Sequence, residues 1–209
     1  IFDTKLSYDG IIGALKENTI KKFIATIEYY PEEGMYHVDG HRKCGVSYTL
    51  DETRNRRGIC MKCGKPVTVG VLNRLDKLAD RAEVDMAVQV RAVKIGEVMG
   101  KQYGRRPPFI NLVTLDTIIA ESLGVGDTSK KVKAQYEAMI KEFGSELEIL
   151  MNLPLHQLSS TRSPLPPSLT EGIRRMRSGE LTITPGFDGQ YGEVSIFSAS
   201  EKKAIKKRL

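Results

Sequence analysis

The sequence lacks the features of a membrane-spanning or exported protein. No run of eighteen uncharged apolar residues occurs, and the first twenty residues mix charged and apolar groups instead of placing a basic start before an apolar stretch. We therefore expect no membrane contact, no secretory signal and a cytoplasmic location. The 209 residues, 40% hydrophobic and 28% charged, are enough to bury a core and are close to globular averages.

The signatures of common catalytic sites are also missing. The sequence contains no HExxH motif, no Walker loop, no Ser-His-Asp order and no paired carboxylates on one helical face. His156 stands alone and is expected to be a surface or packing residue. The sequence therefore predicts no catalytic residue in this chain.

Cysteine is scarce, but its spacing is informative. Cys60 and Cys63 are separated by two residues, and His41 and Cys44 have the same separation. Two such pairs can each wrap one side of a tetrahedral zinc ion through a tight turn. Gly64 follows the last cysteine and allows the backbone to turn its amides toward the thiolates. We predict a structural zinc site with a closed ligand shell, which stabilises the fold and does not activate water.

The fourth ligand of this site is less determined than the three cysteines. His41 is favoured because gaps of two to four residues between ligands are the common ones. His37 is an alternative, and Ser47 lies where a further cysteine would complete an all-cysteine set.

Positive charge is concentrated around the predicted zinc site. The net charge is +6, and an excess of eight cations over two anions between positions 41 and 75 accounts for all of it. Cations held on a rigid tip bind phosphate backbones without base specificity. A solvated basic loop is the simpler alternative. Arg54, Arg56 and Arg57 are expected in the loop between the ligand pairs. The full set of candidate DNA-binding residues here is Arg42, Lys43, Arg54, Arg56, Arg57, Lys62 and Lys65.

A second candidate phosphate site is the string SLGVGDTSKKV at 122–132. A Gly-hydrophobic-Gly turn between two helices leaves amides free beside lysines, which suits one phosphate. The string resembles the hairpin of helix-hairpin-helix DNA-binding modules, and its candidate residues are Gly124, Gly126, Lys130 and Lys131. A plain glycine-rich turn between helices is the alternative.

Apolar periodicity predicts the order of elements. Helices are expected over 9–18, 71–82, 117–123, 129–143 and 169–177, with Asp116 as the N-cap of the third. Extended segments are expected over 23–30, 180–185 and 193–197, and the last two form a hairpin. Residues 84–106 and 146–152 fit either type. The predicted fold class is α+β, with a zinc ribbon inserted near the N-terminal third, a helical middle and a C-terminal hairpin.

Three strings together resemble the C-terminal half of endonuclease Q: TIEYYPEEGMYHVDGHRKCGVSY, GICMKCGKPVTVGVLNRLDKLADR and PGFDGQYGEVSIF. Members of that family are archaeal and bacterial repair enzymes that nick DNA 5′ to uracil, hypoxanthine and abasic sites. Their catalytic metal ligands lie in an N-terminal polymerase-and-histidinol-phosphatase domain. The resemblance implies that this chain, which begins at Ile1, is a fragment downstream of those ligands that binds DNA without cutting it.

The resemblance also suggests segments and partners. It implies that 1–39 is the edge of the upstream catalytic domain, 40–71 the zinc-ribbon module, 72–158 an α-rich DNA-binding region, and 159–209 a Pro/Ser linker with a short helix and hairpin. DNA and the upstream domain are the implied partners, and a sliding clamp is a further candidate.

Two positions depart from the family's pattern. Ser47 stands where cysteine is frequent, and Asn73 stands where histidine is common, so Asn73 is given no role. Some members carry older labels as helicase-related proteins, but the sequence shows no nucleotide-binding loop. The alternative from another class is a stand-alone zinc-ribbon module that docks onto protein or RNA.

Overall fold

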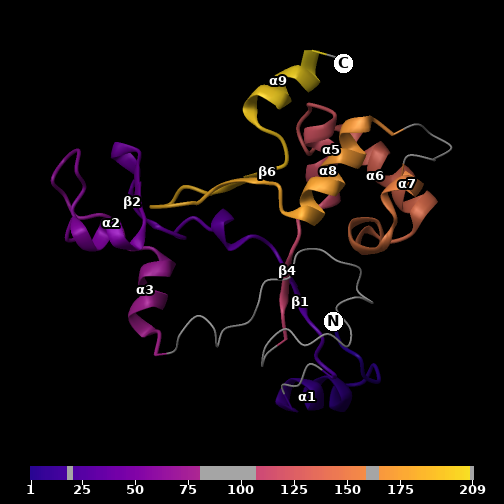
Figure 1. Cartoon of the computed structure of the whole chain (residues 1–209), viewed down its shortest axis with the longest axis horizontal. Coiled ribbons are helices and arrows are strands. Elements are labelled where there is room, and N and C mark those ends of the chain that lie inside the picture. The colour runs from indigo at the N-terminus through magenta and orange to yellow at the C-terminus, as the bar shows by residue number, and fades with distance from the viewer. Residues whose placement is uncertain (18–20, 81–106, 159–164, 208–209) are drawn as a thin grey trace. The chain divides into compact units, whose positions relative to one another are not determined.

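The computed structural model describes residues 1–17, 21–80, 107–158 and 165–207 (Figure 1). Residues 84–106 lie outside the described parts, as does most of the predicted Ser/Pro linker. Within the described parts, helices are combined with short strands, so the predicted α+β class is confirmed. None of these helices has the length and apolar character needed to span a bilayer.

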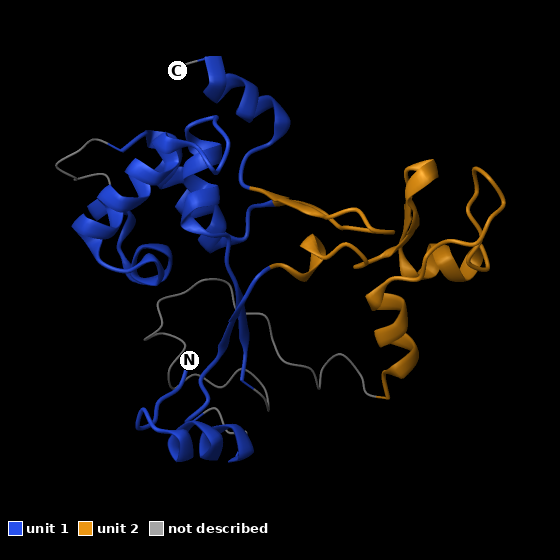
Figure 2. Cartoon of the chain, turned by 180° about the vertical axis from the view of Figure 1, so that it is seen from behind, with its two compact units in different colours: residues 1–29, 84–181, 196–209 blue, residues 30–83, 182–195 orange. Residues whose placement is uncertain are grey.

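The chain divides into two compact units (Figure 2). We call residues 1–29, 84–181 and 196–209 the helical unit, and residues 30–83 and 182–195 the knuckle unit. The predicted segment 159–209 is therefore shared between the units. Its hairpin belongs to the knuckle unit, and its helices belong to the helical unit.

The helical unit combines one parallel strand pair with several helices. β1 (Thr26–Glu28) pairs with β4 (Phe109–Asn111). The helices are α1 (Tyr8–Glu17), α5 (Leu115–Ser122), α6 (Lys130–Phe143), the π-helical turn η4 (Glu148–Asn152), α7 (Leu155–Leu158), α8 (Pro167–Ser178) and α9 (Ala199–Lys207). The segment 146–152, which fitted strand or helix, is thus helical. Fully buried side chains such as Ile118, Met139 and Ile173 form the core.

Close contacts fix α8 within this unit. A Cβ at Gly172 would lie 2.9 Å from Cγ2 of Ile118, so glycine allows α8 to approach α5. Near the end of α8, the guanidinium of Arg177 donates hydrogen bonds of 2.7–2.8 Å to three main-chain carbonyls in and just after η4. Burial lowers the pKa of Arg177, but the three carbonyls offset the cost of placing this cation inside the unit.

The boundaries of α6 agree with the sequence prediction. The Ser129 hydroxyl accepts a hydrogen bond from the Lys131 amide at 3.2 Å and caps the first turn. Gly144, with φ of +96°, ends the helix. Local residues set both ends, which explains the agreement.

The expected N-cap role of Asp116 is wrong. Helix α5 begins two residues earlier than predicted, at Leu115, and Thr114 occupies the N-cap position. The Leu115 amide donates a hydrogen bond of 2.8 Å to the carboxylate of Glu146. This cap comes from a residue 31 positions away, so local sequence could not reveal it.

The knuckle unit contains short elements only. They are η1 (Pro31–Glu33), β2 (Asp39–His41), η2 (Arg42–Cys44), β3 (Val46–Tyr48), α2 (Leu50–Asn55), α3 (Val71–Leu78), β5 (Thr182–Thr184) and β6 (Glu193–Ser195). β2 and β3 are antiparallel, with Gly40 opposite Ser47. β5 and β6 are also antiparallel, which confirms the predicted C-terminal hairpin.

The hairpin is joined to η1 through main-chain contacts. The amides of Gly186 and Gly192 donate to the carbonyls of Glu32 and Glu33 at 2.8 and 3.1 Å. A Cβ at Gly192 would lie 2.0 Å from the Glu32 oxygen, so only glycine permits this approach. The glycine-rich sequence of the turn therefore also serves a tertiary contact.

The expected loop between the two ligand pairs contains a helix. Thr49 and Glu52 form a capping box at the start of α2, with bonds of 2.9 and 3.3 Å between each side chain and the other's amide. Arg54 consequently lies on the helix and Arg56 at its C-cap. The sequence pattern of a capping box, Thr49 followed three residues later by Glu52, is the local signal for this helix.

Candidate metal centre and basic surfaces

His41, Cys44, Cys60 and Cys63 converge in the knuckle unit. One ligand atom from each residue lies within 4.8 Å of the others. Tetrahedral zinc with bonds of 2.0–2.3 Å would place its ligand atoms about 3.6–3.8 Å apart. His41 Nδ1 and Cys63 Sγ are already 3.3 Å apart, so the four residues could hold a metal ion. His37 and Ser47 are not members of this cluster.

Two similar turns, which we call the knuckles, present these ligands. The first connects β2 to β3 and carries His41 and Cys44. The second, enclosed by a β-bridge between Ile59 and Pro66, carries the other two cysteines. In each knuckle the residue after the second ligand closes the turn with a main-chain hydrogen bond. The Gly45 amide donates to the Arg42 carbonyl, and the Gly64 amide donates to the Cys60 carbonyl, both at 2.9 Å.

A left-handed glycine follows the second ligand of each knuckle. Gly45 has φ of +57° and Gly64 has φ of +69°. Side-chain residues rarely adopt this region, so glycine lets the chain reverse directly after the ligand. Only Gly64 was singled out from the sequence, although Gly45 has the same place relative to its cysteine.

The apolar core below the knuckles is small. It contains Val46, Tyr48, Cys60 and Val67, with Cys44 packed against it. The Tyr48 hydroxyl accepts a hydrogen bond of 2.8 Å from the Met61 amide, which ties the second knuckle to β3. A core of so few apolar groups stabilises the knuckle unit only weakly. A bound metal ion would supply an additional constraint.

The protonation of the cysteines reflects their crowding. Burial raises the pKa of Cys60, but hydrogen bonds from the Lys62 and Cys63 amides and from the side chains of His41 and Cys63 outweigh it and lower the pKa to about 6. The hydrogen bond with Cys63 and burial raise the pKa of Cys44 to about 11. Cys60 is therefore shifted toward the thiolate, whereas Cys44 would need a bound cation to favour loss of its proton.

The C-terminal hairpin supports the first knuckle. The Asp188 carboxylate accepts a hydrogen bond of 2.6 Å from the Arg42 amide and one of 2.5 Å from the Thr68 hydroxyl. These bonds, led by that from Thr68, lower the pKa of Asp188. Sequence reasoning missed this contact, because 146 positions separate Arg42 from its partner.

Some of the candidate basic residues have structural partners. Arg54 forms ion pairs with Asp51, at 3.1 Å, and with Asp76 of α3. Arg56 stacks on the ring of Tyr48, with its guanidinium carbon 5.3 Å from the ring centroid. Lys62 donates to the Cys44 carbonyl at 2.8 Å. These three residues therefore also stabilise the knuckle unit.

The other basic candidates of the knuckle unit are exposed. Lys43 lies in the first knuckle, Lys65 adjoins the second, and Arg57 follows α2. Their side chains have no ion-pair partner among the described residues. Arg42 is exposed as well, although its amide donates a hydrogen bond to Asp188 and its charge acts on the same carboxylate. These cations are available to a phosphate backbone.

The Gly-Val-Gly turn lies between α5 and α6, as predicted. Gly124 has φ of +58°, and Gly126 is exposed. Lys130 and Lys131 are exposed in the first turn of α6. Three lysines of α9, Lys202, Lys203 and Lys206, also lie beside this turn, and the sequence analysis gave them no role.

Comparison with known proteins gives matches over most of the chain. The family model described as the MJ0043 C-terminal domain matches residues 114–180. The uncharacterized protein MJ0043 of Methanocaldococcus jannaschii is 30% identical over 189 residues, which are 90% of this chain and 21% of that protein. The uncharacterized protein YqxK of Bacillus subtilis is 28% identical over 87% of this chain and 38% of YqxK. The chain thus spans well under half the length of these relatives.

Solved structures give the more informative match. The lesion-specific endonuclease PfuEndoQ from Pyrococcus furiosus superposes with a TM-score of 0.71 and 28% identity over 97% of this chain. The resemblance to endonuclease Q is confirmed. A second structure, endonuclease Q in complex with a 27-mer duplex substrate with an abasic lesion at the active site, gives a TM-score of 0.67 and 30% identity over 94% of the chain. The chain spans about half of endonuclease Q, 47% and 45% of the two structures.

Proposed function

We propose that this chain is the zinc-bearing, DNA-binding part of a metal-dependent repair endonuclease that nicks DNA 5′ to deaminated bases and abasic sites. The observation that carries the proposal is the superposition of 97% of the chain on a lesion-specific endonuclease. The matching structure bound to an abasic duplex supports DNA as the partner. The chain alone is expected to bind DNA without cleaving it.

Zinc is the metal that we propose for the knuckles. Three sulfur ligands and one imidazole suit zinc in tetrahedral geometry, whereas magnesium and calcium prefer oxygen. The four ligands fill the coordination shell, so the ion would have no open position for water or substrate. Its role would be to hold the two knuckles together.

The knuckles would contribute to catalysis indirectly, by gripping the DNA backbone. Turns fixed by a metal would lose less backbone entropy on contacting phosphates than mobile turns do. Such contacts carry no base information. Selection of damage would come from the base itself, because extruding a nucleotide costs least where pairing is already weakened.

The salt dependence of DNA binding tests this proposal. We would measure the affinity of the zinc-loaded chain for intact and abasic duplexes by fluorescence anisotropy at several salt concentrations. With roughly four to six phosphate contacts, log K should fall with log salt at a slope of about −0.9 per contact. A module that docks onto protein would show little DNA binding at any salt concentration, which would overturn the proposal.

A charge-removal variant tests the surface. Lys43→Ala/Arg57→Ala/Lys65→Ala removes exposed cations without a described ion-pair partner, and Lys5→Ala/Lys16→Ala/Lys141→Ala removes the same charge from exposed positions of the helical unit. We expect the first variant to weaken binding equally for all sequences and to reduce the salt slope by about 2–3. The second variant should bind like the original chain. Equal DNA affinities of the two variants would show that the DNA-binding surface does not include Lys43, Arg57 and Lys65.

A further inference from the structure

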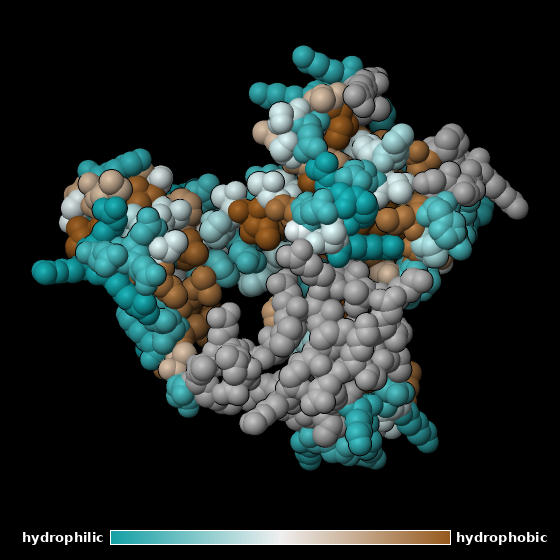
Figure 3. Space-filling model, viewed as in Figure 1, coloured by the Kyte–Doolittle hydropathy of each residue, from teal (hydrophilic) through white to brown (hydrophobic). Residues whose placement is uncertain are grey.

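A cavity of about 380 Å³ lies beside the Gly-Val-Gly turn of the helical unit. Ala120, Glu121 and residues 124–126 line one part of it, and Lys202, Lys203 and Lys206 of α9 line another. Lys130 and Lys131, the lysines adjacent to the turn in sequence, do not line it. Figure 3 shows hydrophilic side chains gathered over α9, at the top of the view.

The backbone of the turn is closely approached by α9. A Cβ at Gly124 would lie 2.8 Å from Cγ of Lys206 and 3.5 Å from its main-chain atoms. The φ of +58° at Gly124 also favours glycine. Glycine at this position therefore permits both the turn and the approach of a lysine to its backbone.

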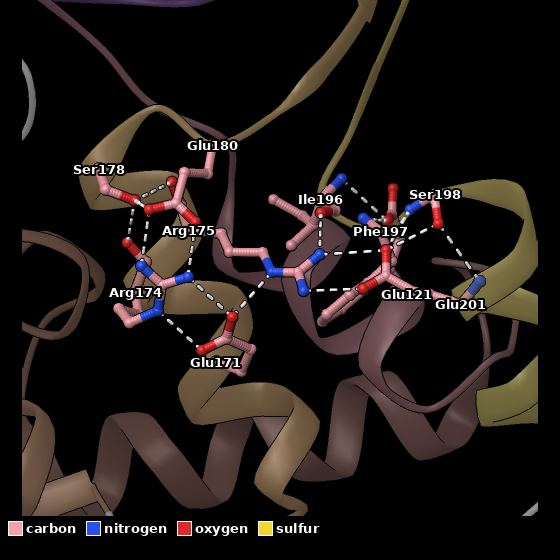
Figure 4. A network of polar contacts seen from close by, with 10 residues as sticks. All are labelled: Glu121, Glu171, Arg174, Arg175, Ser178, Glu180, Ile196, Phe197, Ser198 and Glu201. Atoms are coloured by element: carbon pink, nitrogen blue, oxygen red, sulfur yellow. Dashed lines mark hydrogen bonds and ion pairs between the residues drawn. The ribbon is translucent and has the colours of Figure 1, made fainter.

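Polar contacts hold α9 in this place (Figure 4). The Glu201 carboxylate accepts hydrogen bonds from Arg175 of α8 at 2.7 and 3.1 Å and from the Ser198 amide at 2.8 Å. The Glu121 carboxylate of α5 accepts hydrogen bonds of 3.0 and 3.1 Å from the amides of Ile196 and Phe197, which lead into α9. The lysines of α9 are thus presented from a fixed helix rather than from a free tail.

The charges at the cavity are unequal. Lys202 forms an ion pair of 3.2 Å with Glu121. Lys203 and Lys206 are exposed, and neither has a carboxylate partner among the described residues. Gly126 is exposed, and its amide donates no hydrogen bond within the described parts of the chain. Two unbalanced cations and an unused amide donor match the needs of a phosphate oxygen.

We propose that α9 and the Gly-Val-Gly turn form a second DNA-binding site, which takes one backbone phosphate of a duplex. Lys203 and Lys206 supply the charge, and the turn supplies main-chain donors. That the ligand is DNA rests on the proposed function. The position of the phosphate site rests on the geometry of the helical unit. This site adds residues of α9 that lie nearly 80 positions from the turn in sequence.

The test is a pair of matched double variants of the full chain in its zinc-loaded form. Lys203→Ala/Lys206→Ala removes the proposed contact, and Lys16→Ala/Lys141→Ala removes the same charge from exposed positions on α1 and α6. We expect the first to lower affinity for an intact duplex about tenfold at low salt and to reduce the salt slope by about 1. The second should stay within about twofold of the original chain.

The outcomes separate this inference from the proposed function. If the unmodified chain binds no duplex, the proposed function and the α9 site are both overturned. Duplex binding that falls equally in the two double variants would overturn the α9 site alone. Lys203→Arg/Lys206→Arg keeps the charge and should restore affinity if the lysines contact phosphate. Circular dichroism of each variant checks that α9 remains helical, so that an affinity loss reports contact and not unfolding.

Discussion

At the scale of single residues, the candidate metal site depends on four side chains and two glycines. His41 and Cys60 each begin a knuckle, and the left-handed Gly45 and Gly64 each end one. A side chain at either glycine would cost on the order of 1 kcal/mol, because its φ lies in the region that glycine alone adopts readily. The chain reverses twice in the same way, which lets two distant pairs meet around one point.

We predict that Cys60→Ser abolishes stoichiometric zinc binding and unfolds the knuckle unit. Cys60 is fully buried and belongs both to the ligand cluster and to the small core. A structural zinc ion contributes on the order of 10 kcal/mol to such modules. Elemental analysis of the purified variant would measure the loss. Ser47→Ala, at an exposed position outside the cluster, serves as the control and should retain zinc.

Residue-scale reading of the sequence succeeded where spacing carries the information. The two-residue gaps predicted the cluster of His41 with three cysteines, and the structure brings these four together. It failed where a partner is distant. Neither the Asp188 contact to the first knuckle nor the Glu146 cap of α5 is encoded by a local pattern.

At the scale of elements, ion pairs connect α8 to the segments that follow it. Glu171 lies between Arg174 and Arg175, at 2.8 Å from each, and the arginines continue to Glu180 and Glu201 at 2.7 Å (Figure 4). Arg175 also lies over the Phe197 ring, 5.0 Å from its centroid. A network of this kind stabilises more than isolated surface pairs do, because its members hold one another in place.

The network should make the helical unit sensitive to acid. The bond from Arg175 leads the contacts that lower the pKa of Glu201 from 4.5 to about 2. A carboxylate with a lowered pKa stabilises the fold above its unfolded pKa, and this contribution is lost as pH falls through the folded value. The free energy of unfolding should therefore decline between about pH 4.5 and pH 2.

Glu201→Gln tests this sensitivity. The variant should be less stable than the original chain at pH 7, and the difference should shrink as pH falls toward 2. Unfolding midpoints followed by far-UV circular dichroism at several pH values measure it. Glu137→Gln, on the exposed face of α6, is the control. A stability difference that stays constant with pH would show that Glu201 acts through packing rather than charge.

At the scale of the whole molecule, the two units have separate cores. Buried side chains such as Ile118 and Met176 stabilise the helical unit, whereas the knuckle unit has only a few buried apolar residues beside the cluster of His41 and three cysteines. Metal removal should consequently affect the units unequally.

We predict that a strong chelator unfolds the knuckle unit and leaves most of the helical signal intact. The reason is that α1 and α5–α9 belong to the helical unit, and of the α-helices in the described residues only the short α2 and α3 belong to the knuckle unit. Calorimetry with and without chelator should show the loss of one transition and the persistence of another. Loss of all helical signal on chelation would contradict the prediction.

The sequence by itself determined those features whose causes are local. The ligand gaps, the cap and stop of α6 at Ser129 and Gly144, and the glycine-rich hairpin turn each depend on a few neighbouring residues. Short-range geometry and hydrogen bonding fix such features before the chain folds further.

The tertiary structure alone decided which distant segments share a unit. The hairpin joins the knuckles through Asp188, and α9 approaches the Gly-Val-Gly turn through Lys206. The sequence marked the turn, but no local pattern connects it to the lysines of α9. Such pairings arise from shape, burial and charge across the folded chain, and these are properties of contacts between residues far apart in sequence.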